Sequence, residues 1–288
     1  MTRGTVRAVA IGMLCVGTLI AETRKEYRFN VSSKAGISVN NTYGSISVKP
    51  STGNVVVIDA VLHSNQVEVD SGQTGNRVNV ESHLLPGATP ETGRVDYEVY
   101  VPADASVILH SSTGPLHAER LRGDVTLEGS DAPVDVRDIS EGHIHVKTLN
   151  GPITLSNVRD GHVEVESLSG EVTLNGVTGQ IVQVMSTSGK ISYIGDFGNS
   201  GEYRLTSHSG DIDAIIPAST SADVTARSVR GEVDDEVPLQ PKSHNWFSFK
   251  QGSAFAGTVG KAASSVVLRT FSGKIHLKKR SETKKNSD

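Results

Sequence analysis

Short phrases of alternating apolar and polar residues recur along most of the chain and predict β-strands. Each phrase consists of a glycine, any residue, a branched apolar residue, a polar residue and a second apolar residue, as in GPITL at 151–155, GEVTL at 170–174 and GKISY at 189–193. A period of two places every second side chain on one face of a strand, and Val and Ile favour the pleated backbone. We therefore expect short strands that each bury one face.

The residues that open these phrases form two interleaved series, each with a period of about 19 to 21 residues. Ser or Asn stands before most glycines of the first series, whereas Arg122, Glu141, Asp160 and Thr178 precede those of the second. The last step of the first series spans two periods, with one glycine missing or displaced. The first series begins its phrases at Gly114, Ala132, Gly151, Gly170, Gly189, Gly210, Gly231 and Gly273, and the second at Gly123, Gly142, Gly161 and Gly179.

This double series predicts an all-β fold, a β-solenoid of two-strand coils with about 19 to 21 residues per coil. Each strand is expected to pair with its equivalent in the next coil, and each glycine to provide a corner with positive φ. A meander of hairpins folded as a sandwich also fits the spacing, but the consistent difference between the two corners favours the solenoid. Two apolar ladders are expected, one of Val134, Ile153, Val172, Ile191 and Ile212 and a facing one of Val125, Ile144, Val163 and Ile181.

The two ends of the chain follow the repeat less closely. We expect a single domain over residues 27–278, with less regular strands at its N-terminal end, the regular repeat over about 111–277 and a disordered polar tail at 279–288. A loop insertion at 236–262 interrupts the repeat. Its aromatic residues are expected either to cap the open end of the solenoid or to anchor a partner. They form the candidate contact surface, which consists of Trp246, Phe247, Phe249 and Phe255.

The N-terminal segment has the pattern of a signal peptide over residues 1–21. Arg3 and Arg7 precede an apolar run of about fourteen residues, which is shorter than the roughly 20 residues of a membrane-spanning helix. Cleavage after Gly17 or Ala21 is expected, with an uncleaved anchor as the alternative. Cys15 is the only cysteine, so the cleaved chain has no disulfide and no thiolate site.

Composition and charge exclude some partners. The chain has 288 residues, a formal net charge of -4 and a pI near 6.2, which give no general attraction to nucleic acid. Contact with a membrane is expected only through the N-terminal segment, if that segment is not cleaved.

The sequence contains few candidates for chemistry. His143 and His162 occupy equivalent positions in neighbouring coils and are expected to face each other, but their other equivalents, Asp124 and Gln180, indicate an ordinary polar corner. The tripeptide Arg122-Gly123-Asp124 resembles a cell-attachment motif, yet it falls on a regular glycine corner of the repeat. We expect no catalytic residues, no cofactor and no metal site.

Several segments together resemble a known family. They are the signal-like start, the strand VDYEVYVP at 95–102, the repeated Thr/Ser-x-Asn/Ser-Gly-x-Ile/Val-x-Leu phrase and LRTFSGKI at 268–275. These features resemble the bacterial putative-adhesin, β-strand-repeat domain of unknown function over roughly residues 30–278. The resemblance implies an exported, all-β envelope protein, and it supplies no catalytic residues because fold alone does not determine function.

The sequence therefore predicts an exported, non-enzymatic β-repeat protein of the adhesion or scaffold type. We expect it to present a sheet face to a protein or polysaccharide partner of the cell envelope or surface, in the periplasm, on the cell surface or outside the cell. One alternative is a carbohydrate-active β-helix enzyme, a lyase or hydrolase, which needs carboxylates or basic residues converging on one sheet face. Another is an envelope-stress accessory protein that binds a membrane sensor.

Overall fold

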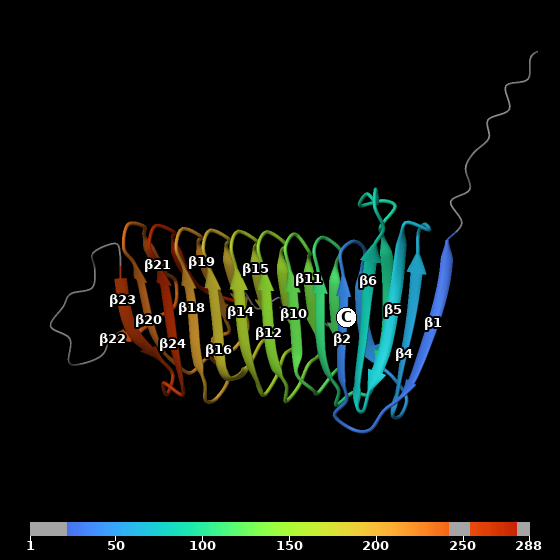
Figure 1. The fold of residues 1–288 in the computed structure, drawn as a ribbon. Coiled ribbons are helices and arrows are strands. Elements are labelled where there is room, and N and C mark those ends of the chain that lie inside the picture. The colour runs from blue at the N-terminus through green and yellow to red at the C-terminus, as the bar shows by residue number, and fades with distance from the viewer. Residues whose placement is uncertain (1–21, 242–253, 281–288) are drawn as a thin grey trace, which may run out of the picture.

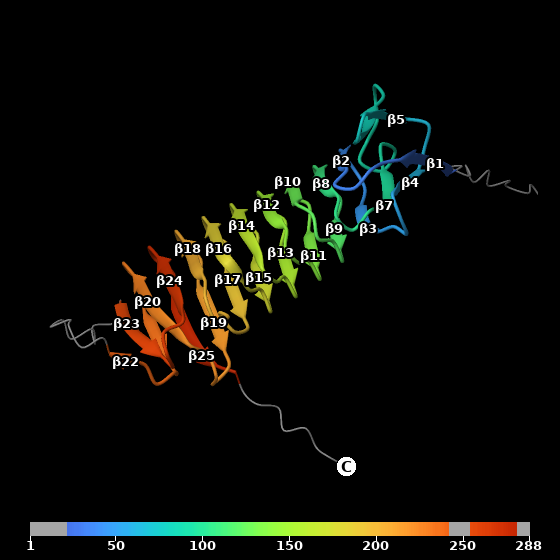
Figure 2. The same cartoon turned by 90° about the horizontal axis from the view of Figure 1, so that it is seen from below.

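Two long β-sheets lie against each other and form an elongated molecule (Figures 1 and 2). The computed structural model describes residues 22–241 and 254–280, and every regular element within these ranges is a β-strand. We call the sheet of 12 strands sheet A and the sheet of 13 strands sheet B. The predicted all-β solenoid is confirmed. The predicted signal peptide, residues 1–21, lies outside the described ranges, as does the predicted tail beyond Arg280.

The order of the strands in space differs from their order in the chain. From one edge to the other, sheet A consists of β1 (Thr23–Asn30), β4 (Val55–Leu62), β7 (Val95–Val101), β3 (Ile46–Pro50), β9 (Leu116–Glu119), β11 (Val134–Arg137), β13 (Ile153–Ser156), β15 (Val172–Asn175), β17 (Ile191–Ile194), β19 (Ile212–Ile216), β25 (Ile275–Lys279) and β21 (Val233–Asp235). Sheet B consists of β22 (Gln240–Pro241), β23 (Ala254–Val259), β20 (Ala222–Ser228), β24 (Ser264–Thr270), β18 (Glu202–Ser207), β16 (Gly179–Ser186), β14 (Gly161–Ser167), β12 (His143–Thr148), β10 (Val125–Gly129), β8 (Ser106–Ser111), β2 (Gly36–Asn41), β6 (Arg77–Leu84) and β5 (Val67–Thr74).

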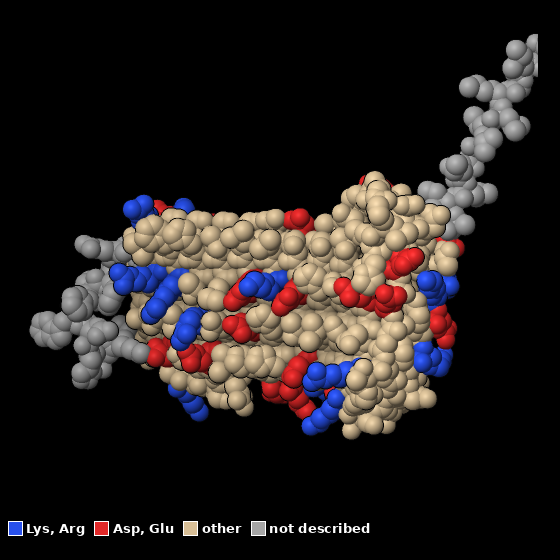
Figure 3. All heavy atoms as spheres, in the orientation of Figure 1, with Lys and Arg blue, Asp and Glu red and all other residues tan. Residues whose placement is uncertain are grey.

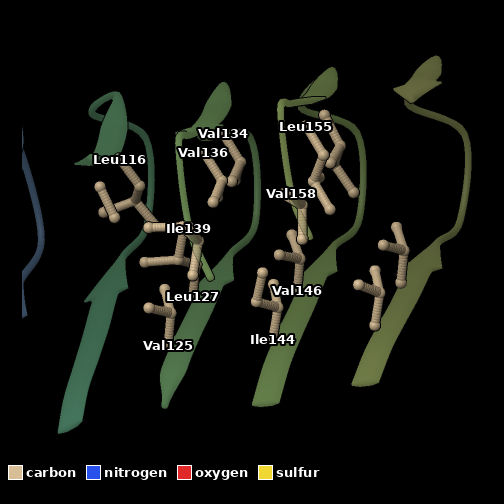
Figure 4. Packing of buried hydrophobic residues seen from close by; sticks show 14 of the residues in the cluster. Leu116, Val125, Leu127, Val134, Val136, Ile139, Ile144, Val146, Leu155 and Val158 are labelled. Carbon is tan, nitrogen blue, oxygen red and sulfur yellow. The ribbon is translucent and has the colours of Figure 1, made fainter. Parts of the chain in front are cut away.

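In the regular part of the chain, each coil is one strand of sheet B followed by one strand of sheet A. Equivalent strands of neighbouring coils pair in parallel, and the predicted ladder from Val134 to Ile212 forms in register. Its side chains are buried and meet those of sheet B between the sheets (Figure 4). A third apolar row, which the strand pattern did not reveal, lies at the second corner and consists of Leu121, Ile139, Val158 and Val177.

The predicted ladder of sheet B is wrong at one position. Val125, Ile144 and Val163 pair as expected, but Val163 pairs with Val182 rather than with Ile181. The register shifts at this point because β16 contains one extra residue, a β-bulge. As a result Val182 is fully buried, whereas Ile181 points outward and is 39% exposed.

The coils at the two ends of the solenoid do not stack in chain order. At the C-terminal end the last coil, β24 and β25, is inserted between the coil of β18 and β19 and the coil of β20 and β21. This corrects the expectation that each strand pairs with its equivalent in the next coil, and it explains the double step from Gly231 to Gly273. The predicted loop insertion at 236–262 is only partly a loop, because it contains β22 and β23, which pair antiparallel at the edge of sheet B.

The N-terminal end has the same kind of insertion. The first coil, β2 and β3, lies between the coil of β6 and β7 and the coil of β8 and β9. Strands β1, β4 and β5 pair antiparallel beyond it and close this end. The outermost strand of sheet A, β1, has the charged sequence TRKEYRFN, and charged edge strands resist pairing with other chains. Each terminal coil is thus held between two others.

The glycine corners are required by close packing rather than by positive φ, contrary to the sequence-based expectation. The φ angles of Gly151, Gly170, Gly189 and Gly210 are not in the positive region. A Cβ atom added at Gly170 would lie 2.0 Å from the carbonyl oxygen of Gly151 in the preceding coil. The corners therefore stack backbone on backbone, with no room for a side chain.

A buried hydroxyl group completes most of the first corners. In one coil Gly151 N donates a hydrogen bond to Thr148 Oγ1 at 3.1 Å, and in a later coil Gly210 N donates to Ser207 Oγ at 2.8 Å. These bonds satisfy backbone groups that the tight turn removes from water. The coil that opens with Ala132 differs, because Gly129 stands at the hydroxyl position and a Cβ there would lie 2.7 Å from the Ala132 Cβ.

A charged cluster joins three strands at the N-terminal end. The Asp96 carboxylate on β7 accepts hydrogen bonds from the backbone and side chain of Ser45, both at 2.8 Å, and contacts Arg94 at 2.8 Å and His63 at 2.7 Å. Burial alone raises the pKa of the Asp96 carboxyl, but the hydrogen bonds from Ser45, Arg94 and His63 outweigh it and lower this pKa to about 2. The charged form of Asp96 therefore stabilises this end of the fold.

We predict that Gly170→Ala destabilises the protein by about 2–3 kcal/mol, because the added methyl group must displace a backbone carbonyl in the neighbouring coil. Gly72 is the matched control, because no atom lies within 4 Å of a Cβ added there. Gly72→Ala should change the free energy of unfolding by less than about 1 kcal/mol. Urea unfolding of residues 22–288, followed by circular dichroism, measures both changes. Equal losses in the two variants would refute direct stacking of the corners.

We also predict that Asp96→Asn lowers the free energy of unfolding at pH 7 by about 1–2 kcal/mol, allowing for partial exposure of the carboxylate. The folded-state pKa lies below the unfolded value of about 3.9, so the stabilisation is present above pH 4 and is lost as the pH falls toward 2. The difference between the wild type and Asp96→Asn should therefore shrink between pH 4 and pH 2. Glu68→Gln on β5 is the control, and a difference independent of pH would contradict this account.

Candidate functional site

The outward face of sheet B carries rows of side chains that run across the strands. In the middle of this face, basic and acidic groups of neighbouring coils pair with each other. His145 Nδ1 lies 3.5 Å from Glu164 Oε2, and Lys147 Nζ lies 3.2 Å from Glu166 Oε2. Opposite charges across neighbouring strands stabilise a sheet modestly and leave little net charge to attract a ligand.

The C-terminal end of the same face is different. Arg227 on β20 and Arg269 on β24 are direct register partners, and both side chains are exposed. They line a hollow of about 560 Å³, which we call the arginine hollow. Figure 3 shows basic side chains at this end of the face, with acidic side chains below them and nearer the middle. The residues lining the arginine hollow are Thr225, Ala226, Arg227, Val229, Ala254, Phe255, Ala256, Arg269 and Thr270.

Neither arginine of the hollow forms an ion pair within the described ranges. Nearby Arg204 on β18, by contrast, is held by Glu202 at 2.6 Å. Like charges directly opposite each other on neighbouring strands repel. The pair of Arg227 and Arg269 is therefore a local concentration of positive charge that the described protein residues do not neutralise.

A third exposed arginine adjoins the hollow at the first corner. The Arg230 guanidinium lies over the Phe271 ring, 4.8 Å from its centroid. The His208 ring stacks on the same Phe271 ring, with the two centroids 5.1 Å apart and an interplanar angle of 5°. Such cation–π contact restricts the guanidinium without neutralising its charge. The corner thus holds a further cation next to Val229.

The pairing of the last coil with the coil before it brings this site together. Residues 227 and 269 are far apart in the sequence, and they become neighbours because β24 pairs in parallel with β20. The space beside Arg227 arises from β23, whose register partner for Arg227 is the small residue Ala254. No local pattern in the sequence indicates this arrangement. The proximity of these two exposed arginines can be recognised only once the order of the strands is known.

Of the four aromatic residues predicted as a contact surface, the structure describes Phe255. Trp246, Phe247 and Phe249 lie outside the described residues. Phe255 on β23 is half-buried, pairs in register with the buried Ala226 and packs against the core. The side chain of Phe255 therefore covers the end of the core, and the residue is also one of those that line the arginine hollow.

His143 and His162 face each other as predicted. Their rings stack with centroids 4.3 Å apart and an interplanar angle of 15°. The backbone N–H of His143 donates to Asp124 Oδ1 at 3.0 Å, which ties the two corners together. Within residues 22–241 and 254–280, no group of three or more His, Cys, Asp or Glu side chains is arranged to hold a metal ion.

The Arg122-Gly123-Asp124 tripeptide forms a structural corner. A Cβ added at Gly123 would lie 2.1 Å from the carbonyl oxygen of Ala105, so this glycine stacks like the others of its series. Asp124 is engaged by the hydrogen bond from His143. The geometry gives the tripeptide the role of linking successive coils.

The outward face of sheet A contains carboxylates that pair with bases. His117 Nδ1 lies 3.1 Å from Asp135, Lys190 Nζ lies 2.8 Å from Asp213, and His276 Nδ1 lies 3.3 Å from Asp234. These pairs are spread along the sheet. This face therefore resembles a solvated surface more than a site that gathers charge.

No helix in the described part of the chain is long and apolar enough to cross a membrane. A search of curated proteins finds none that matches this chain. A comparison with solved structures finds two matches at low identity. One is a putative cell adhesion protein from Clostridium sporogenes ATCC 15579, with 12% identity, a TM-score of 0.29 and coverage of 90% of this chain and 100% of that chain. The other is a putative adhesin from Bacteroides fragilis NCTC 9343, with 13% identity, a TM-score of 0.43 and coverage of 90% and 98%.

The family comparison is more extensive. The family model described as Toastrack DUF4097 matches residues 34–278, which include every described strand except β1 and the last residue of β25. The match confirms the resemblance to a β-strand-repeat family that the sequence shows. The chain therefore belongs to the Toastrack DUF4097 family.

Proposed function

We propose that this protein is an exported, non-enzymatic protein of the adhesion or scaffold type, which presents the outer face of sheet B to a partner in the cell envelope or on the cell surface. The observation that carries this proposal is the arginine hollow. It contains two adjacent guanidinium groups without carboxylate partners among the described residues, whereas charges in the middle of the face are paired. A negatively charged partner supplies the anionic groups that these two arginines lack within the described protein.

The architecture supports a role in presenting a surface. The parallel strands from β8 to β20 form a continuous face of eight strands, which at about 4.8 Å per strand extends roughly 35 Å. Both end coils of the solenoid are held by their neighbours, so the face is preorganised. Preorganisation lowers the entropy cost of binding.

The N-terminal sequence supports export. Arg3 and Arg7 followed by a short apolar run are typical of a secretory signal, and a chain cleaved after this run has no cysteine. A disulfide-free protein in an oxidising compartment needs another source of stability, and the stacked sheets provide one. We place the protein in the periplasm, on the cell surface or outside the cell.

The runner-up is a carbohydrate-active enzyme, because arginines on an exposed sheet face also suit the binding of an acidic sugar before its cleavage. The two proposals differ in the fate of the ligand. Binding alone supports the adhesion or scaffold role, and release of shortened products identifies an enzyme.

We predict that labelled residues 22–288 bind isolated cell envelopes of the source bacterium saturably, without releasing oligosaccharides. Thr225→Glu places a negative charge in the arginine hollow and should weaken this binding about tenfold or more. Thr173→Glu is the matched control, because Thr173 is a half-buried outward residue of sheet A. It should leave envelope binding unchanged.

The outcomes separate the proposals. Loss of binding in Thr173→Glu but not in Thr225→Glu would move the contact face to sheet A. Absence of saturable binding would refute the adhesion or scaffold role. Oligosaccharide release by the wild-type protein would establish the enzyme instead.

A further inference from the structure

We propose that the arginine hollow binds the carboxylate groups of an acidic polysaccharide, a chain that contains uronic acid residues. This inference rests on the proposed function and specifies the chemical class of its partner. It is carried by the arrangement of Arg227, Arg269 and Arg230 and by the charge distribution of the face around them.

The two arginines of the hollow are spaced for neighbouring anionic groups. Their Cα positions are register partners on adjacent parallel strands, which lie about 4.8 Å apart. A guanidinium group binds a carboxylate through two parallel N–H···O bonds, and this geometry favours planar anions. Repulsion between Arg227 and Arg269 is relieved when an anion binds between or beside them.

The lining of the hollow suits a sugar. Thr225 offers a hydroxyl group, and Ala254, Ala256 and Val229 provide small apolar surfaces, with Val229 52% exposed. Sugar rings present both hydroxyl groups and apolar C–H faces, so a mixed surface of this kind contacts them well. Arg230, held over Phe271, adds a cation at the corner where a polymer leaves the hollow.

The rest of the face favours a narrow polymer over a flat anionic surface. A membrane lying against sheet B also meets Glu128 on β10 and Glu164 and Glu166 on β14, which lie nearer the middle of the same face. A polysaccharide chain seated in the arginine hollow avoids these carboxylates, because no Asp or Glu of the described chain lines the hollow.

The test uses residues 22–288 and polygalacturonate as the probe, with binding measured by isothermal titration calorimetry. Fully methyl-esterified polygalacturonate, which has the same sugar backbone without charge, and vesicles of phosphatidylglycerol are the comparison ligands. We expect saturable binding of polygalacturonate that weakens as salt is added, and much weaker binding of the ester and the vesicles.

The variant Arg227→Gln/Arg269→Gln should weaken binding of polygalacturonate by about 10- to 100-fold, because hydrogen bonds to charged groups are lost at two positions. Arg24→Gln/Arg28→Gln on the exposed β1 strand at the opposite end is the matched control and should bind as the wild type does. Thermal unfolding of both variants checks that the fold is intact, which we expect because all four side chains are exposed.

The inference is overturned if the ester binds as well as the acid, if Arg227→Gln/Arg269→Gln binds normally, or if the protein binds the vesicles but not polygalacturonate. Envelope binding by the wild-type protein without binding of polygalacturonate would overturn this inference and leave the proposed function standing. Failure of both assays would overturn both.

Discussion

Direct stacking of backbone on backbone at the glycine corners is the constraint on which the rest of the structure depends. The carbonyl oxygen of one coil occupies the space in which a Cβ of the next would lie, as between Gly151 and Gly170. Successive coils must therefore have nearly equal length and identical register. Where β16 contains one residue too many, the chain expels it as a bulge and Val182 restores the ladder. Each coil in this way copies the previous one.

A stack of this kind has two open ends, and both are closed by the same device. The first and last coils of the chain are each inserted one place inward. Antiparallel strands then pair with the outermost coil, in both sheets at the N-terminal end and in sheet B at the C-terminal end. Neither terminal coil can detach without breaking hydrogen bonds on both sides, so the ends are protected from fraying and from edge-to-edge association. The C-terminal insertion also affects the arginine hollow, because it places β20, rather than β24, beside the antiparallel strand β23. The strand that covers this edge of sheet B therefore also lines the arginine hollow.

Much of the fold is predictable from local patterns, because alternation and period are local properties. The ladder from Val134 to Ile212 and the stacked rings of His143 and His162 follow from spacing alone. The bulge before Ile181 was missed because Ile181 and Val182 are both apolar, and only packing decides between them. The arginine hollow was missed for a different reason. Its residues come from coils whose order depends on long-range pairing, and a repeat of similar strands does not encode that order locally.

Disulfide cross-linking at the C-terminal end tests the inserted order most directly. Asp213 on β19 is the register partner of His276 on β25, and His276 in turn is the partner of Asp234 on β21. In residues 22–288, which lack cysteine, Asp213→Cys/His276→Cys should oxidise to a disulfide, because the two Cα atoms lie about 4.8 Å apart. Asp213→Cys/Asp234→Cys should not, because one strand intervenes and the Cα atoms are about 10 Å apart. The reverse result would show that the coils stack in chain order, with β21 rather than β25 beside β19.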